Sequence, residues 1–390
     1  RPLTVFALET YADDPCECFI PRNPNMVYIS QHDENFWAKV HKAISVIQFK
    51  LEGQIIKRHP EFNMDNHLML DKINYENGTI MLEGKEYKLK DTNFPTINPE
   101  NPFELTDAEK ELMNLLRSSF LRSEKLQNHV KFLYEKGSIY LTFNNNLLYH
   151  GCIPMNSDGT FTEVTLFGET VSGKSLMDKA EQLARDGYFA KNGSEEKEYG
   201  KDFLWFLWCG CYSPVYGKNK MTSFERYFID DESTWVEIKD EYYHLIEKPS
   251  VCNKILCEFG IDPNNFSHII NGHVPVHQSE GENPLKCDGK VIMIDGGFSK
   301  PYHKVTGIAG YTLTYNSYGL TLTAHEPFES AEQVIQNGKD IVSNQVAVQH
   351  AFNRILVGDT DNGKKLKENI ADLKELIEAY RQGIISEREK

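Results

Sequence analysis

The chain has 390 residues, of which 40% are hydrophobic and 12% aromatic, so it can form two or three domains with real cores. Its formal net charge of -15 argues against nucleic acid or an anionic membrane surface as a partner. No apolar run approaches the ~18–20 residues of a membrane span. Its eight cysteines are too sparse for a disulfide framework, which predicts free thiols and a cytoplasmic location.

The first part of the chain predicts helices and one small hairpin. Apolar side chains recur at steps of three and four over residues 33–59, which predicts an amphipathic helix ended by Pro60. Within residues 71–90, the Asn77-Gly78 pair lies between two β-prone runs. This dipeptide is a strong signal for a two-residue hairpin turn.

A helix and a second hairpin are predicted next. Thr106 and Glu109 have the spacing of a capping box, which predicts one long helix ending near Gly137. Residues 138–149 alternate around an asparagine-rich turn and predict a hairpin, with His150 at its exit. Downstream, a helix is expected at residues 175–185 and two C-terminal helices at 330–357 and 364–381. Short β runs are expected at residues 163–167, 269–270, 291–294, 311–314 and 320–323.

Residues 168–175 match the phosphate-binding pattern G-x-x-x-x-G-K-[ST] through Gly168, Gly173, Lys174 and Ser175. The match follows a β run and opens a helix, as such a loop must. The alternative is a Gly-rich turn leading into a surface helix. That alternative is favoured because residues of a different character precede the match and no repeated βα units follow it. Nucleotide binding is kept as an alternative function.

Two histidines each follow an apolar run and lie beside a glycine: His150 in residues 147–154 and His273 in residues 270–275. A buried strand delivers an imidazole to a site at its carboxyl end in this way. Neutral imidazole is a ligand for Mn, Fe and Zn, so both residues are candidate metal ligands. The alternative is a hydrogen-bonded structural histidine. His277 is a weaker candidate that could equally lie at the rim.

Cations cluster in residues 216–227 of this acidic chain, where Lys218, Lys220 and Arg226 could hold a phosphate group. A solvated charged face is the equally good alternative.

From Thr4 to Phe328 the chain resembles class III fructose-1,6-bisphosphatases, which are metallophosphoesterases. The resemblance rests on Asp13-Asp14-Pro15-Cys16 and on the strings at residues 204–210, 218–227, 271–276 and 294–313. It implies removal of the 1-phosphate of fructose 1,6-bisphosphate in gluconeogenesis, typically with two Mn²⁺ ions. By the same resemblance, His150 and His273 would bind the second metal.

The aspartate-rich metal motifs of that family are missing. The resemblance therefore implies that this is a carboxyl-terminal portion that lacks the bridging carboxylate and the catalytic acid, and that it is inactive alone. The alternatives are the nucleotide-binding protein and a non-catalytic regulatory or oligomerisation half.

The expected fold is α/β, a partial metallophosphoesterase α-β-β-α sandwich with large helical insertions. Residues 1–137 would be a mainly helical segment, inserted in or flanking the catalytic domain. Residues 138–329 would form the second half of that domain with an aromatic-rich insertion at about 185–250, and residues 330–390 would be C-terminal helices. The expected partner is a small sugar bisphosphate, with no nucleic acid and no membrane, and the sequence leaves homo-oligomer formation open.

Overall fold

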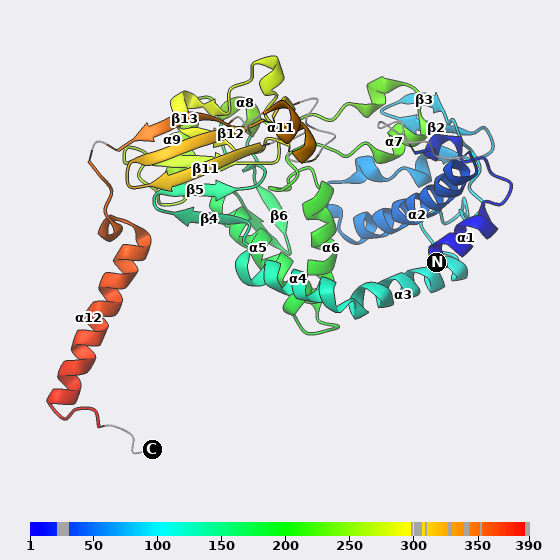
Figure 1. Cartoon of the computed structure of the whole chain (residues 1–390). Coiled ribbons are helices and arrows are strands. Elements are labelled where there is room, and N and C mark those ends of the chain that lie inside the picture. The colour runs from blue at the N-terminus through cyan, green and yellow to red at the C-terminus, as the bar shows by residue number, and fades with distance from the viewer. Residues whose placement is uncertain are drawn as a thin grey trace. The chain divides into compact units, whose positions relative to one another are not determined.

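The computed structural model describes residues 1–21, 31–297, 299, 306–308, 310–326, 330–338, 343–351 and 353–386. They form a mixed α/β structure, as predicted (Figure 1). All eight cysteines are free, also as predicted. No helix among the described residues is long and apolar enough to cross a membrane. The chain divides into unit 1 (Arg1–Ile139, Ile153–Asn156, Thr160–Glu241) and unit 2 (Tyr140–Cys152, Ser157–Gly159, Tyr242–Lys390).

Unit 1 begins with a helical layer packed on a small antiparallel sheet. Its predicted amphipathic helix is confirmed as α2. The hairpin turn differs from the prediction, because Asn74 pairs with Thr79 and the loop holds four residues. The Asn74 side chain accepts hydrogen bonds from two backbone N–H groups in that loop and so stabilises the longer turn. The elements are α1 (Pro2–Thr10), α2 (Gln31–Arg58), β1 (Ile73–Asn74), β2 (Thr79–Leu82), β3 (Lys85–Lys88) and α7 (Ser223–Phe228).

The single long helix predicted after Thr106 is wrong, although its capping box is confirmed. The structure has α3 (Asp107–Arg122) and α4 (Glu124–Lys136), separated by Ser123 in an extended conformation. Serine favours the position before a helix over its interior, because its hydroxyl competes for backbone hydrogen bonds.

The second core of unit 1 is built around the pair α5 (Gly173–Phe189) and α6 (Glu195–Cys209). The hairpin of β6 (Val164–Leu166) and β7 (Glu169–Val171) adds Val164 and Leu166 to it. The two helices come close at Gly187 and Gly200, because a Cβ on Gly187 would lie 2.7 Å from the backbone of Gly200.

Replacing Gly187 by Ala is therefore expected to destabilise unit 1 by roughly 1–3 kcal/mol, since the helices must separate. In an uncrowded helix the same change would stabilise by about 1 kcal/mol. Urea unfolding would measure the difference, with Gln182→Ala on the exposed side of α5 as the control. A Gly187→Ala protein as stable as the parent would contradict the close crossing.

Unit 2 contains a five-stranded sheet in the order β4-β5-β8-β10-β9. The predicted hairpin is confirmed as β4 and β5, joined by Asn144 and Asn145 in the left-handed conformation. Strands β5, β8 and β10 run parallel in the centre. The elements are β4 (Tyr140–Phe143), β5 (Asn146–Tyr149), α8 (Tyr242–Leu245), α9 (Pro249–Glu258), β8 (His268–Asn271), β9 (Leu285–Lys286) and β10 (Val291–Met293).

The predicted helix at residues 330–357 is wrong. Helix α11 (Ala331–Asn337) is followed by Gly338 in the left-handed region, and β13 (Ser343–His350) then pairs with β12. Val346 and Val348 are β-branched, and such residues are enriched in strands. The remaining elements are β11 (Gly310–Asn316), β12 (Gly319–His325) and α12 (Asp361–Arg381), the last of which confirms the predicted final helix.

Candidate functional site

The candidate site lies at the carboxyl ends of the three parallel strands of unit 2. Tyr149 of β5 and Met293 of β10 both pair with Asn271 of β8, so the three strands end level with one another. His150 follows β5 directly and His273 follows β8 by two residues. Loops at this edge of a parallel sheet form the crevice where α/β proteins bind ligands.

The structure brings the two predicted histidines together. His150 Nε2 lies 2.9 Å from His273 Nδ1, with the rings inclined by 70°. The Gly272 N–H donates to the carbonyl of His150 at 3.0 Å, which joins the two loops directly. His273 has a φ of +66°, a left-handed conformation that is strained for a residue with a Cβ. Such strain is typical of functional positions, where the surrounding structure enforces it.

The two nitrogens lie at hydrogen-bond distance, which fits the alternative of structural histidines, and their spacing also fits two ligands of one metal ion. A histidine nitrogen lies about 2.1 Å from a divalent ion such as Zn²⁺. Two such nitrogens would lie about 3.4 Å apart at a tetrahedral angle and about 3.0 Å apart at the right angle of an octahedral site, which is the geometry typical of Mn²⁺. No group of three or more His, Cys, Asp or Glu side chains that could hold a metal occurs among the described residues. Within the described part of the chain, the two imidazoles are thus not joined by a third side chain of these types.

Burial favours the neutral form of the His150 imidazole. Desolvation lowers the pKa of His150, and the charge of Asp295 opposes that shift. Asp295 follows β10 and is held by its own loop, since its carboxylate accepts the Gly297 N–H at 2.9 Å. A neutral ring keeps a nitrogen lone pair available for a metal. Residues 298, 300–305 and 309 of the string that follows Asp295 lie outside the described residues.

Sequence reasoning missed Asn271, which fixes the loop carrying His150. This buried residue donates from Nδ2 to the carbonyl of Gly151 at 2.5 Å and to that of His150 at 3.3 Å. Its Oδ1 is buried and has no hydrogen-bond partner in the part of the chain that the structure describes. A polar residue directly after two isoleucines was the available signal.

Replacing Asn271 by Ala is expected to lower the free energy of unfolding by roughly 1–3 kcal/mol, because the buried Gly151 carbonyl loses its side-chain donor, whereas the His150 carbonyl keeps the Gly272 N–H. Urea unfolding would measure it, with exposed Asn265→Ala as the control. Equal stability of the two variants would show that Asn271 does not hold the loop.

Comparison with known proteins gives the family. The family model described as Firmicute fructose-1,6-bisphosphatase matches residues 1–382. The chain belongs to the class 3 fructose-1,6-bisphosphatase family. It is 54% identical to the class 3 fructose-1,6-bisphosphatase of Clostridium novyi over 388 residues, 53% to that of Clostridium tetani over 386 and 54% to that of Alkaliphilus metalliredigens over 389.

These alignments cover 99–100% of this chain but only 58% of each relative. No solved structure matches the chain. The family predicted from the sequence is thus confirmed, while the metallophosphoesterase sandwich and the metal centre stay predictions.

In this family member, the three predicted phosphate-binding cations are paired with carboxylates of unit 1. Lys218 Nζ lies 2.7 Å from Glu237, and Arg226 lies 4.0 Å from the same carboxylate. Lys220 Nζ lies 3.7 Å from Glu225. The geometry favours the alternative to a phosphate site, because the three cations already form a charged cluster with Glu225 and Glu237. An incoming phosphate would have to compete with both glutamates. Phosphate binding by these cations stays a prediction.

Glu225 gives this cluster a pH dependence. Its Oε2 is buried without a hydrogen-bond partner among the described residues, and burial raises the pKa of the carboxyl from 4.5 to about 7 despite Lys220 and Lys72. Between these pKa values the folded chain binds a proton that the unfolded chain does not. The contribution of Glu225 to stability therefore falls as pH rises through this range.

We expect the Glu225→Gln variant to become more stable relative to the parent as pH rises from about 5 to about 8. The gain in the free energy of unfolding should be on the order of 2–3 kcal/mol, because one pKa unit corresponds to about 1.4 kcal/mol. Urea unfolding across this range would measure the difference. Burial lowers the pKa of His67 to about 4 in both proteins, so its contribution to the pH dependence largely cancels in the difference between them. A difference independent of pH would contradict a raised pKa at Glu225.

The residues of the phosphate-loop match do not form such a loop. Gly168 lies in the tight turn between β6 and β7, and β7 separates it from Gly173. Lys174 forms an ion pair with Asp178 at 2.6 Å, and Ser175 donates to the carbonyl of Ser172 at 2.8 Å as part of a helix cap. A phosphate cradle needs one continuous loop between strand and helix, so the geometry favours the Gly-rich turn, and nucleotide binding stays a prediction.

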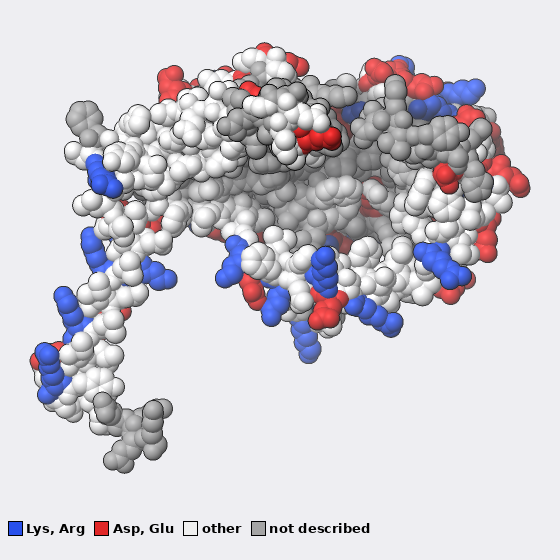
Figure 2. All heavy atoms as spheres, viewed as in Figure 1, with Lys and Arg blue, Asp and Glu red and all other residues white. Residues whose placement is uncertain are grey.

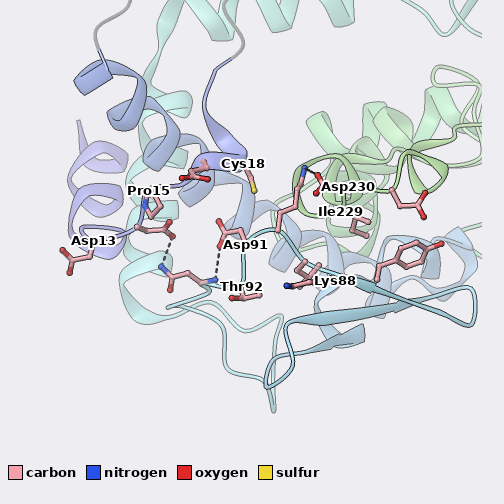
Figure 3. A pocket seen from close by; sticks show the side chains of 15 residues that line it. Asp13, Pro15, Cys18, Lys88, Asp91, Thr92, Ile229 and Asp230 are labelled. Atoms are coloured by element: carbon pink, nitrogen blue, oxygen red, sulfur yellow. Dashed lines mark hydrogen bonds and ion pairs between the residues drawn. The ribbon is translucent and has the colours of Figure 1, made fainter.

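A pocket of about 990 Å³ in unit 1 carries the wrong charge for a phosphate ester (Figure 3). Asp13, Asp91 and Asp230 are among its six acidic lining residues, against two lysines. Asp13, Asp14 and Pro15 of the string from the family resemblance also line it. The string has a structural role there, since Asp14 accepts hydrogen bonds from Cys16 N–H and from Asn93, both at 2.8 Å.

Proposed function

We propose that the complete protein hydrolyses fructose 1,6-bisphosphate to fructose 6-phosphate and phosphate at a dinuclear Mn²⁺ centre, as expected in gluconeogenesis. The relatives carry the name fructose-1,6-bisphosphatase, and the chain aligns with them over nearly its whole length. The observation that carries the proposal is the 2.9 Å approach of His150 Nε2 and His273 Nδ1 at the ends of two parallel strands.

In this proposal, His150 and His273 hold one side of one metal ion. The bound metal would supply Lewis-acid stabilisation of charge on the phosphoryl oxygens. The residues around the two histidines would keep these ligands in position. Asn271 and the Gly272 N–H tie both histidine loops to β8, so the nitrogens stay at ligand spacing.

Phosphate release by the complete gene product with Mn²⁺ tests the proposal. Fructose 1,6-bisphosphate should be turned over well ahead of fructose 6-phosphate, which is the control for non-specific phosphatase activity. Intact bisphosphate beside turnover of another ester would defeat the substrate assignment. Metal analysis of the chain alone is a second test, because two tightly bound ions would contradict an incomplete ligand set.

A further inference from the structure

Helix α12 carries a straight apolar stripe on its surface. Leu366, Ile370, Leu373, Ile377 and Tyr380 follow one another at alternating steps of four and three, and each is between 44% and 57% exposed. In Figure 2 the uncharged side chains run along this helix, with Lys and Arg beside them.

The spacing repeats every seven residues, which is the pattern of a coiled-coil seam. Ile370 and Ile377 take the a positions, and Leu366, Leu373 and Tyr380 take the d positions. β-branched residues at a with leucine at d favour two parallel strands. We propose that α12 pairs with α12 of a second copy of this chain as a parallel, in-register coiled coil.

The flanking charges favour parallel over antiparallel pairing of two identical helices. The e positions are all cationic: Lys367, Lys374 and Arg381. Parallel pairing places Lys374 and Arg381 beside Asn369 and Leu376 of the second copy, so no like charges meet. Antiparallel pairing would place Lys374 against itself and Lys367 near Arg381, which repel.

The rest of the helix fits this partner better than a membrane. The surface away from the seam is net acidic, whereas helices that lie on anionic lipid have a basic polar face. It carries Glu368, Asp372, Glu375 and Glu378 beside Lys364 and Lys365. The start of α12 is fixed within unit 2, since Asn144 and Asp361 exchange two hydrogen bonds of 2.6 and 2.9 Å. Both copies would therefore enter the coiled coil from the same anchor, as a closed two-fold dimer requires.

Sedimentation velocity over two decades of concentration tests the pairing. We expect a monomer–dimer equilibrium whose dissociation constant rises roughly tenfold or more in Ile377→Asp, because a charge would enter the seam. Ala371→Asp, on the outer surface of the same helix, is the matched control and should leave it unchanged. A monomer at every concentration, or equal effects of both variants, would overturn the proposal. Binding of the parent, but not Ile377→Asp, to anionic vesicles without dimer formation would overturn it in favour of a membrane.

Oxidative crosslinking tests the orientation. Leu366→Cys should give a disulfide-linked dimer, because residue 366 meets its own copy only in a parallel pair. Glu368→Cys, which points away from the seam, should give the background of the native cysteines. Equal crosslinking of the two would overturn the parallel arrangement. Neither readout depends on metal or on phosphatase activity, so the proposed function can fail independently.

Discussion

Replacing His150 or His273 by Ala is expected to lower Mn²⁺-dependent phosphate release by the complete protein by at least roughly 100-fold. Loss of a residue that merely supports a metal ligand typically costs 10–100-fold, and loss of the ligand itself should cost no less. Because the rings approach to 2.9 Å, each variant should also weaken Mn²⁺ binding. Activity measured as a function of Mn²⁺ concentration would separate weaker binding from slower turnover.

His277→Ala is the matched control. His277 lies on the same segment but faces Glu280, with Nδ1 3.5 Å from that carboxylate. We expect its removal to change activity little. Equal losses from His277→Ala and His273→Ala would point to a general disturbance of the loop, and full activity of His150→Ala would remove it from the metal site.

Local signals in the sequence were sufficient where the elements depend on neighbouring residues. Asn144 and Asn145 tolerate the left-handed conformation, so the hairpin and the exit of His150 could be predicted. The meeting of His150 with His273 could only be inferred from the family. It depends on parallel pairing between strands more than 100 residues apart, which no local pattern encodes.

Sequence reasoning failed where distant partners decide the structure. Residues 343–350 become a strand because β12 offers an edge, although the run also fits a helix. Lys218 and Arg226 suggested a phosphate site because Glu237, which neutralises both, comes from a separate segment. The burial of Lys42 could not be predicted from the sequence, because lysine side chains are almost always exposed.

Replacing Lys42 by Met is expected to lower the free energy of unfolding of unit 1 by about 3–5 kcal/mol at neutral pH. The Lys42 side chain is fully buried, with Nζ 2.5 Å from Asp14 and 2.6 Å from Asp91. It connects α2 to the segments that follow α1 and β3. Removing the cation leaves two buried carboxylates without their counter-charge, a larger cost than the loss of an exposed pair. Urea unfolding would measure it.

The size of this effect should depend on pH. Burial alone would raise the pKa of Asp14, but the hydrogen bond from Lys42 and the Cys16 N–H outweigh it and lower the pKa. The stabilisation is present above the unfolded pKa of Asp14 and is lost as pH falls through its folded pKa. In the variant, protonation of Asp14 in acid removes its uncompensated charge, so the deficit relative to the parent should shrink as pH falls. Lys85→Met, which removes an exposed pair with Asp231, is the control and should change stability little at any pH. A deficit for Lys42→Met as small as that of Lys85→Met, or one that does not shrink in acid, would contradict a buried charge network.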